Sequence, residues 1–169
     1  PAAFVGLAAE VVRVPHRPLP AGAAVWNGLF GRWPYTLARY RNAALARRLA
    51  ELAWSLRPAF AMLTPLHMAT YAESLGGVPI VLREHNVEHV WMERYSGSLG
   101  WTPAGLYARA QASRLRRAEA ELCRRAALVL AIQEEEAEVL RRLAPGARVE
   151  TLPVGVDLAR FREPRPDDP

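Results

Sequence analysis

A chain of 169 residues, 51% of them hydrophobic and 23% charged, has the composition of one globular domain, which excludes disordered, collagen-like and coiled-coil classes. Its net charge of +5 comes from arginine, because the sequence has no lysine, and acidic residues are interleaved with the arginines along most of the chain. No apolar run approaches the roughly 20 residues that cross a bilayer. Cys123 is the only cysteine, which excludes an internal disulfide. No signal peptide is readable, and we expect the sequence to begin within a longer protein.

Five apolar segments bounded by turn residues predict strands. Three of them are hydrophobic almost throughout, which is typical of parallel strands that are covered on both faces. The first and last of the five give weaker signals. In chain order the predicted strands are residues 9–14, 59–63, 78–82, 127–132 and 148–152.

Helical patterns precede and separate these strands. Leucines spaced by four and three residues in segment 35–56 give one apolar stripe, and Pro58 ends that helix. A second helix is predicted for residues 103–125, with Thr102 as its N-cap. A third, residues 134–143, begins with three glutamates and ends with two arginines, as the helix dipole favours. Strands that alternate with helices predict an α/β fold with a doubly wound, mostly parallel sheet.

The segment REHNVEHVWMERY, directly after predicted strand 78–82, holds the densest group of polar side chains. Ligands of open α/β sheets bind at the carboxyl ends of the strands, so His85 is the first candidate for a functional site. Asn86 is predicted to cap the helix that follows, which puts Glu88 in its first turn and leaves His85 facing the crevice. A histidine that only forms hydrogen bonds within its loop is the alternative.

The letters HNVEH also match H-x-x-E-H, the zinc-binding helix of the inverted zincin metalloproteases. Zinc binding of that kind needs His85 and His89 on one face of a single helix. Asn86 and the preceding strand predict instead that the helix begins after His85, and no third ligand is evident downstream. We therefore expect neither a metal nor another cofactor.

Two further segments carry weaker signals. TPLHMATYA follows predicted strand 59–63 and places His67 and Tyr71 near the same sheet edge, where they either line the crevice or pack in the core. VWNGLFGRWPYTLARYR mixes aromatic residues with arginines, which suits either contact with anionic lipid or core packing with a basic rim. Neither glycine-rich phosphate-binding motif is present.

Four segments resemble, in order and spacing, the amino-terminal domain of family 4 retaining glycosyltransferases, which consist of two facing Rossmann-like domains (the GT-B type). The resemblance covers about residues 57–161 and rests on PIVLREHNVEHVWMERY, YARAQASRLRRAEAELCRRA, LVLAIQEEEAEVLRRLAPGARV and TLPVGVDLARF. It implies that the first domain grips mainly the acceptor and the second mainly the nucleotide sugar. It also implies that His85 lies beside the transferred sugar and is the catalytic candidate.

The same resemblance bears on positions in the last part of the chain. Gln133 stands where many relatives have serine, and Val154 where asparagine is common. Gly155 would allow a turn between the domains, and Asp157 would cap a short helix that runs toward Phe161. The residues expected to bind substrate are Glu84, Asn86, Glu88, His67, Gln133, Gly155 and Asp157.

Residues 1–161 are thus expected to form an incomplete amino-terminal domain, and residues 162–169 a linker toward a donor-binding domain that this sequence lacks. The implied reaction transfers a hexosyl group from a nucleoside diphosphate sugar to a glycan or lipid-linked acceptor, such as a glycolipid or polysaccharide precursor. We expect a cytoplasmic protein with peripheral contact to the inner membrane face, and a chain that is inactive and prone to aggregation when isolated.

Two other functions stay open on the sequence. A related sugar-nucleotide epimerase would share the architecture but react without an acceptor. A basic module could instead contact phosphates, including those of nucleic acid, although the interleaved acidic residues lead us to expect no nucleic-acid partner. The arginines of that module would be Arg109, Arg114, Arg116, Arg117, Arg124 and Arg125.

Overall fold

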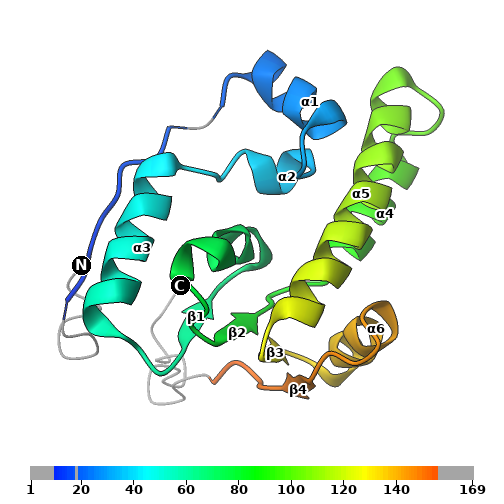
Figure 1. The fold of residues 1–169 in the computed structure, drawn as a ribbon. Coiled ribbons are helices and arrows are strands. Elements are labelled where there is room, and N and C mark those ends of the chain that lie inside the picture. The colour runs from blue at the N-terminus through cyan, green and yellow to red at the C-terminus, as the bar shows by residue number, and fades with distance from the viewer. Residues whose placement is uncertain (1–9, 18, 156–169) are drawn as a thin grey trace, which may run out of the picture.

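The computed structural model describes residues 10–17 and 19–155, in which helices precede and then alternate with the strands of one sheet (Figure 1). No helix in this part of the chain is long and apolar enough to cross a membrane. In order, the elements are α1 (Ala21–Phe30), α2 (Tyr35–Ala38), α3 (Ala43–Leu56), β1 (Ala61–Leu63), the 3-10 helix η2 (Leu66–Leu75), β2 (Ile80–Arg83), α4 (Glu88–Ser98), α5 (Pro103–Arg125), β3 (Leu128–Ala131), α6 (Glu134–Leu143) and β4 (Val149–Thr151).

The sheet has four strands in the order β1-β2-β3-β4, and every neighbouring pair is parallel. Its register aligns Leu63, Leu82, Val129 and Val149 in one row across the strands. All four side chains of this row are buried in the main hydrophobic core. The predicted Rossmann-like α/β fold is therefore confirmed, as are four of the five predicted strands.

One face of this sheet carries the helices. Because the strand order is sequential and parallel crossovers are right-handed, η2, the α4–α5 pair and α6 all lie on the same side. Contacts of α5 with both η2 and α6 agree with this arrangement. On the opposite face Met62 is 48% exposed and its neighbours in register, Val81 and Leu128, are half-buried. Helices were expected on both faces of the sheet, but among the described residues they cover one face only. The strand order of this part is sequential and does not reverse along the sheet.

The two helices predicted around β3 have the expected bounds. α5 runs from Pro103 to Arg125, and the Thr102 hydroxyl accepts a hydrogen bond from the N–H of Gly105 at 3.1 Å, as an N-cap does. The apolar stripe of α5, with Leu115 and Leu122, is buried against the sheet. α6 begins with three glutamates and ends with two arginines, in agreement with the prediction.

Two predictions from the first part of the chain are wrong. Residues 10–14 form no strand, and the helix predicted for 35–56 is two helices, α2 and α3, separated at Asn42. The side-chain oxygen of Asn42 caps α3 by accepting hydrogen bonds from the N–H groups of Ala44 and Leu45. The backbone N–H of Asn42 donates to the Tyr71 hydroxyl at 2.6 Å. That hydroxyl donates in turn to the carbonyl of Tyr40 at 2.6 Å. The break is fixed by a tyrosine 29 residues away, which helical periodicity cannot reveal.

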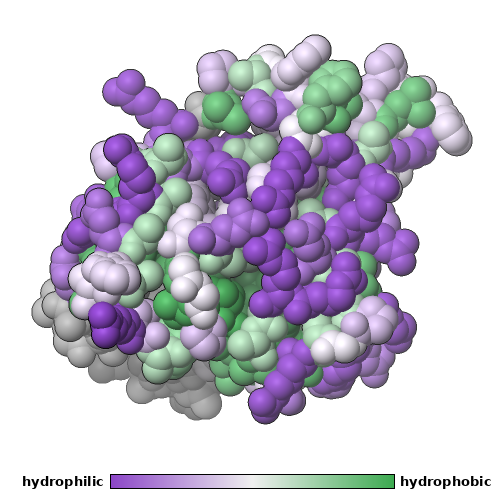
Figure 2. Space-filling view, viewed as in Figure 1, coloured by the Kyte–Doolittle hydropathy of each residue, from purple (hydrophilic) through white to green (hydrophobic). Residues whose placement is uncertain are grey.

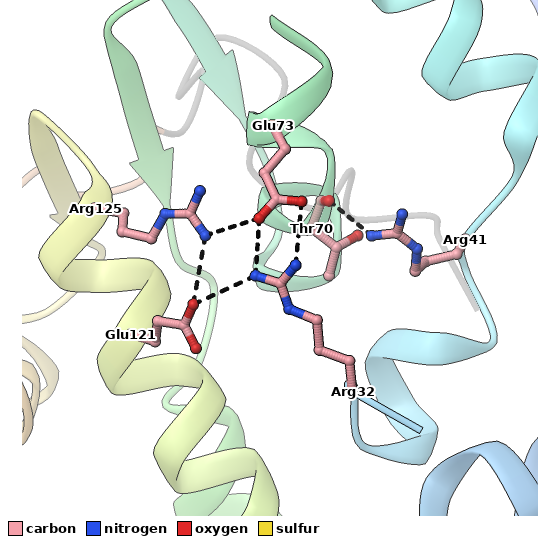
Figure 3. A network of polar contacts seen from close by, with 6 residues as sticks. All are labelled: Arg32, Arg41, Thr70, Glu73, Glu121 and Arg125. Atoms are coloured by element: carbon pink, nitrogen blue, oxygen red, sulfur yellow. Dashed lines mark hydrogen bonds and ion pairs between the residues drawn. The ribbon is translucent and has the colours of Figure 1, made fainter. Parts of the chain in front are cut away.

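A group of four charged side chains joins the segment after α1 to η2 and α5 (Figure 3). Arg32 donates to both carboxylate oxygens of Glu73, at 2.8 and 3.2 Å, and Arg125 approaches the same carboxylate at 3.1 Å. Glu121 lies 3.6 Å from Arg32 and 3.4 Å from Arg125, which closes the ring. Hydrogen bonds from Arg32 and then Arg125 lower the pKa of Glu73 below its usual value. We call these four residues the ionic ring.

Replacing Glu73 by Gln should weaken the ionic ring, because both arginines lose a charged acceptor. We expect the free energy of unfolding to fall by about 0.5 to 1 kcal/mol at low salt, as is usual for exposed ion pairs, and by less in about 1 M NaCl. The wild-type contribution should also vanish as the pH falls through the lowered pKa of Glu73. Urea unfolding measures both effects. Glu51→Gln, which removes an exposed pair with Arg48 only, is the control, and equal losses in both variants would contradict a role for the ring.

Candidate functional site

The carboxyl ends of β1 and β2 bring two polar side chains together. Thr64 follows β1 directly, His85 is the second residue after β2, and both side chains are exposed. The Thr64 hydroxyl lies 3.1 Å from Nε2 of His85, within hydrogen-bond distance. Within residues 10–17 and 19–155 the other ring nitrogen, Nδ1, has no hydrogen-bond partner, so it can donate to or accept from a ligand. Thr64 was not predicted, although its place directly after a predicted strand matches that of His85.

The junction between β2 and α4 is held by a residue of α5. Glu119 is fully buried, and its carboxylate accepts hydrogen bonds from the backbone N–H groups of Glu88 at 2.9 Å and His89 at 3.3 Å. The same carboxylate lies 2.5 Å from Nδ1 of His89. These two N–H groups open α4 and have no partner within the helix, so Glu119 caps it from outside. The sequence does carry a signal for this role, because Glu119 stands next to Ala118, a residue of the buried apolar stripe of α5.

This arrangement bears on two interpretations of HNVEH. Asn86 does not cap α4, because the residue at the N-cap position is Val87 and no side chain within the segment caps the helix. The prediction that His85 precedes the helix is confirmed, since α4 begins at Glu88, so the second interpretation, a zinc-binding helix, does not hold, and His89 is buried against Glu119. In the described part of the chain no three histidine, cysteine, aspartate or glutamate side chains come together as a metal site would need.

Glu84 lies beneath His85 as a buried acid. Its side chain is 1% exposed, and neither carboxylate oxygen has a hydrogen-bond partner among the described residues. Burial raises the pKa of Glu84 well above its usual value, and the nearby carboxylates of Glu119 and Glu88 raise it further. Glu84 was expected to contact substrate, but in this structure it underlies the strand end and does not reach the surface.

A groove with a volume of about 310 Å³ lies between α4 and α6 at the same edge of the sheet. It brings together Asn86 and Gln133, two of the residues expected to bind substrate. Gln133 occupies the N-cap position of α6 without a side-chain capping bond, so its amide is available to a ligand. Glu88 is half-buried next to the groove, and burial and then Glu119 raise its pKa. The lining residues are Asn86, Val87, Val90, Trp91, Arg94, Gln133, Glu135, Glu136 and Val139.

The remaining candidates lie apart from this groove. His67, in η2, is half-buried and stacks on Tyr40 with ring centroids 4.0 Å apart, and burial lowers its pKa. Tyr71 is fully buried and therefore packs in the core. Gly155 is exposed, but its backbone is not in the left-handed region, so its position does not require glycine. Asp157 lies outside the described residues.

The six α5 arginines proposed for a basic module have different surroundings. Arg109 lies over the ring of Trp101, Arg114 donates to the carbonyls of Leu29 and Gly31, and Arg125 belongs to the ionic ring. The other three are exposed and line a groove with a volume of about 650 Å³ between α5 and α6. They are Arg116, Arg117 and Arg124. Arg114 and Arg125 therefore make contacts within the fold, whereas Arg109 lies beside an exposed ring.

A parallel α/β sheet with exposed polar side chains at the carboxyl ends of its strands is typical of Rossmann-like folds, which bind ligands at that edge. The comparison with protein families agrees, because the model named Glycosyltransferase Family 4 matches residues 6–160. The chain belongs to that family, and its general activity is glycosyl transfer. No curated protein and no solved structure matches the chain significantly.

The raised pKa of Glu84 predicts a particular pH dependence of stability. The carboxyl group of Glu84 loses its proton at a higher pH in the folded chain than in the unfolded chain. The free energy of unfolding should therefore fall as the pH rises above about 4.5. One proton limits this slope to about 1.4 kcal/mol per pH unit. Glu84→Gln should flatten it, which urea titrations between about pH 5 and pH 8 would measure. A variant as pH-dependent as the wild type would contradict a neutral, buried Glu84.

Removing the Glu119 side chain should cost more stability than any exposed change in α5. Glu119→Ala leaves two buried N–H groups and the His89 ring without their acceptor, so we expect a loss of about 3 kcal/mol in the free energy of unfolding. Glu121→Ala, two residues along the same helix and half-exposed, serves as the control and should lose at most about 1 kcal/mol. Denaturant titration of both variants decides the point, and similar losses would rule out Glu119 as the cap of α4.

Proposed function

We propose that this chain supplies the acceptor-side wall of a retaining glycosyltransferase that uses a nucleoside diphosphate sugar. The transferred group is a hexosyl unit, and the acceptor is a glycan or a lipid-linked precursor. The observation that carries the proposal is the exposed His85 at the carboxyl end of β2, in a chain that matches the family from residue 6 to residue 160.

The role proposed for His85 is to orient the transferred sugar. Its Nε2 is within hydrogen-bond distance of Thr64, which restricts the rotation of the ring, and Nδ1 is left to bond with a sugar hydroxyl. A fixed imidazole of this kind positions a reactant without forming a covalent bond to it. His85 therefore acts as an orienting group and not as a nucleophile.

The groove between α4 and α6 is the proposed place for the acceptor. The amides of Asn86 and Gln133 offer both donors and acceptors to hydroxyl groups, and Arg94 adds a positive charge. Trp91, 58% exposed at this groove, gives an apolar surface for a sugar ring. Apolar walls with a few polar groups are typical of small-molecule sites.

The diphosphate of the donor would be held by a second domain that follows residue 161, in the two-domain arrangement typical of such enzymes. That domain would stabilise the negative charge of the leaving group. Residues 162–169 would form the linker, and the chain without the second domain would be inactive.

Replacing His85 by Ala in the intact enzyme tests the proposed role. We expect kcat/KM to fall about 100-fold, because the transferred sugar loses its orienting contact. Thr64→Val, which removes only the bond that fixes the ring, should cost about tenfold or less. The measurement is the release of nucleoside diphosphate from the donor sugar that the wild type uses fastest, with acceptor present.

His16→Ala is the matched control, since His16 is also exposed but lies in the segment before α1 and follows no strand. Unfolding curves for each variant separate loss of activity from loss of fold. Wild-type rates in His85→Ala would refute the role of His85. Turnover of the sugar nucleotide that needs no acceptor and frees no diphosphate would favour an epimerase instead.

A further inference from the structure

α1 faces its small residues inward and its large apolar residues outward. Ala24 is 1% exposed and Gly28 is buried, whereas Trp26 and Phe30 are 66% and 69% exposed. Val25 and Leu29 are also exposed, at 41% and 40%. A helix that only packs on its own protein places its large apolar side chains inward, so this orientation points to contact with something else.

The orientation of α1 is fixed by close contact with α5. A Cβ atom at Gly28 would come within 2.6 Å of the Tyr107 hydroxyl and 3.0 Å of the Tyr35 Cβ, so a larger residue here would displace these side chains. The Gly28 carbonyl accepts a hydrogen bond from Gln111 at 2.8 Å, and Arg114 donates to the carbonyls of Leu29 and Gly31. Because these bonds hold the inner face, the helix cannot turn its aromatic side chains inward without breaking them.

The tip of the α4–α5 hairpin continues the apolar surface. Trp101 is 83% exposed and Leu106 is 50% exposed. α1 and this tip lie at the same end of the molecule, and apolar side chains gather there above the polar length of α5 (Figures 1 and 2). We call this area the α1–tip surface: Val25, Trp26, Leu29, Phe30, Trp101 and Leu106.

The segments that form and flank the α1–tip surface contain no acidic residue. Neither residues 11–50 nor residues 94–118, which include α1, α2, the hairpin tip and most of α5, contain an aspartate or a glutamate. Together they hold twelve arginines, of which Arg32 and Arg48 pair with glutamates of other segments or of their own helix. Arg109 lies over the Trp101 ring at 4.2 Å, and Arg39 lies over the Tyr35 ring at 5.6 Å. Aromatic side chains flanked by arginines match the boundary of a bilayer, where rings enter the headgroup region and cations meet lipid phosphates.

We propose that the α1–tip surface binds the interface of an anionic lipid bilayer, with α1 in the membrane plane. Charge complementarity selects this partner over a second copy of the chain, because two such surfaces would bring arginines together without carboxylates to pair with them. The proposal depends on α1 and the hairpin tip alone and does not require the proposed sugar transfer.

Co-sedimentation of the full-length protein with vesicles tests the proposal. We expect binding to vesicles that contain phosphatidylglycerol, little binding to phosphatidylcholine alone, and weaker binding when NaCl rises from about 0.1 M to about 0.5 M. Trp26→Ser/Phe30→Ser should reduce binding about tenfold or more, because two inserted rings are lost. Arg109→Gln should reduce binding to the anionic vesicles less strongly.

Trp54→Ser/Leu56→Ser is the matched control, since these side chains are 78% and 68% exposed at the end of α3. It should bind vesicles like the wild type, and circular dichroism should show that both double variants remain folded. Trp26→Glu, which places a negative charge on the surface, is a second variant that should abolish binding. Equal binding by the wild type and Trp26→Ser/Phe30→Ser would overturn the proposal, as would a dimer of the wild type that this variant dissolves.

Discussion

The carboxylate of Glu119 is the constraint on which the candidate site depends. It is fully buried in α5, yet it bonds to the first backbone N–H groups of α4 and to the ring of His89. This one group fixes where α4 begins and therefore where the loop that carries His85 leaves the sheet. A polar group can be buried here because backbone and imidazole donors bond to it.

Glu84, a second buried acid, lies at the start of the same loop, directly after β2. Glu84 has no bonding partner for its carboxyl oxygens among the described residues and its pKa is raised, whereas the Glu119 carboxylate accepts several hydrogen bonds. Carboxyl groups in one core repel each other when both are ionised, which raises the pKa of the one that lacks hydrogen-bond donors. The strongly raised pKa of Glu84 thus occurs next to His85, and perturbed pKa values of this kind cluster at functional sites.

The sequence predicted the parts of the fold that are set by local pattern. The bounds of α5 and α6 follow from Thr102, the glutamates of α6 and the buried stripe of Leu115 and Leu122, all of which act within one helix. The break at Asn42 and the cap at Glu119 escaped prediction because each depends on a partner about 30 residues away. The contact between Thr64 and His85 likewise requires the register of β1 and β2. The exposed position of His85 could be predicted, since it follows from the end of a strand alone.

The way α1 is attached sets it apart from the rest of the molecule. Its described residues contribute nothing to the main hydrophobic core, and its contact with α5 rests on carbonyls at its end that accept from Gln111 and Arg114. A helix that packs outside the main core can open locally while the sheet stays intact. The amides of α1 should therefore exchange with solvent through this local opening, at a lower free energy than those of β2 and β3, as a separate cooperative unit of the fold would.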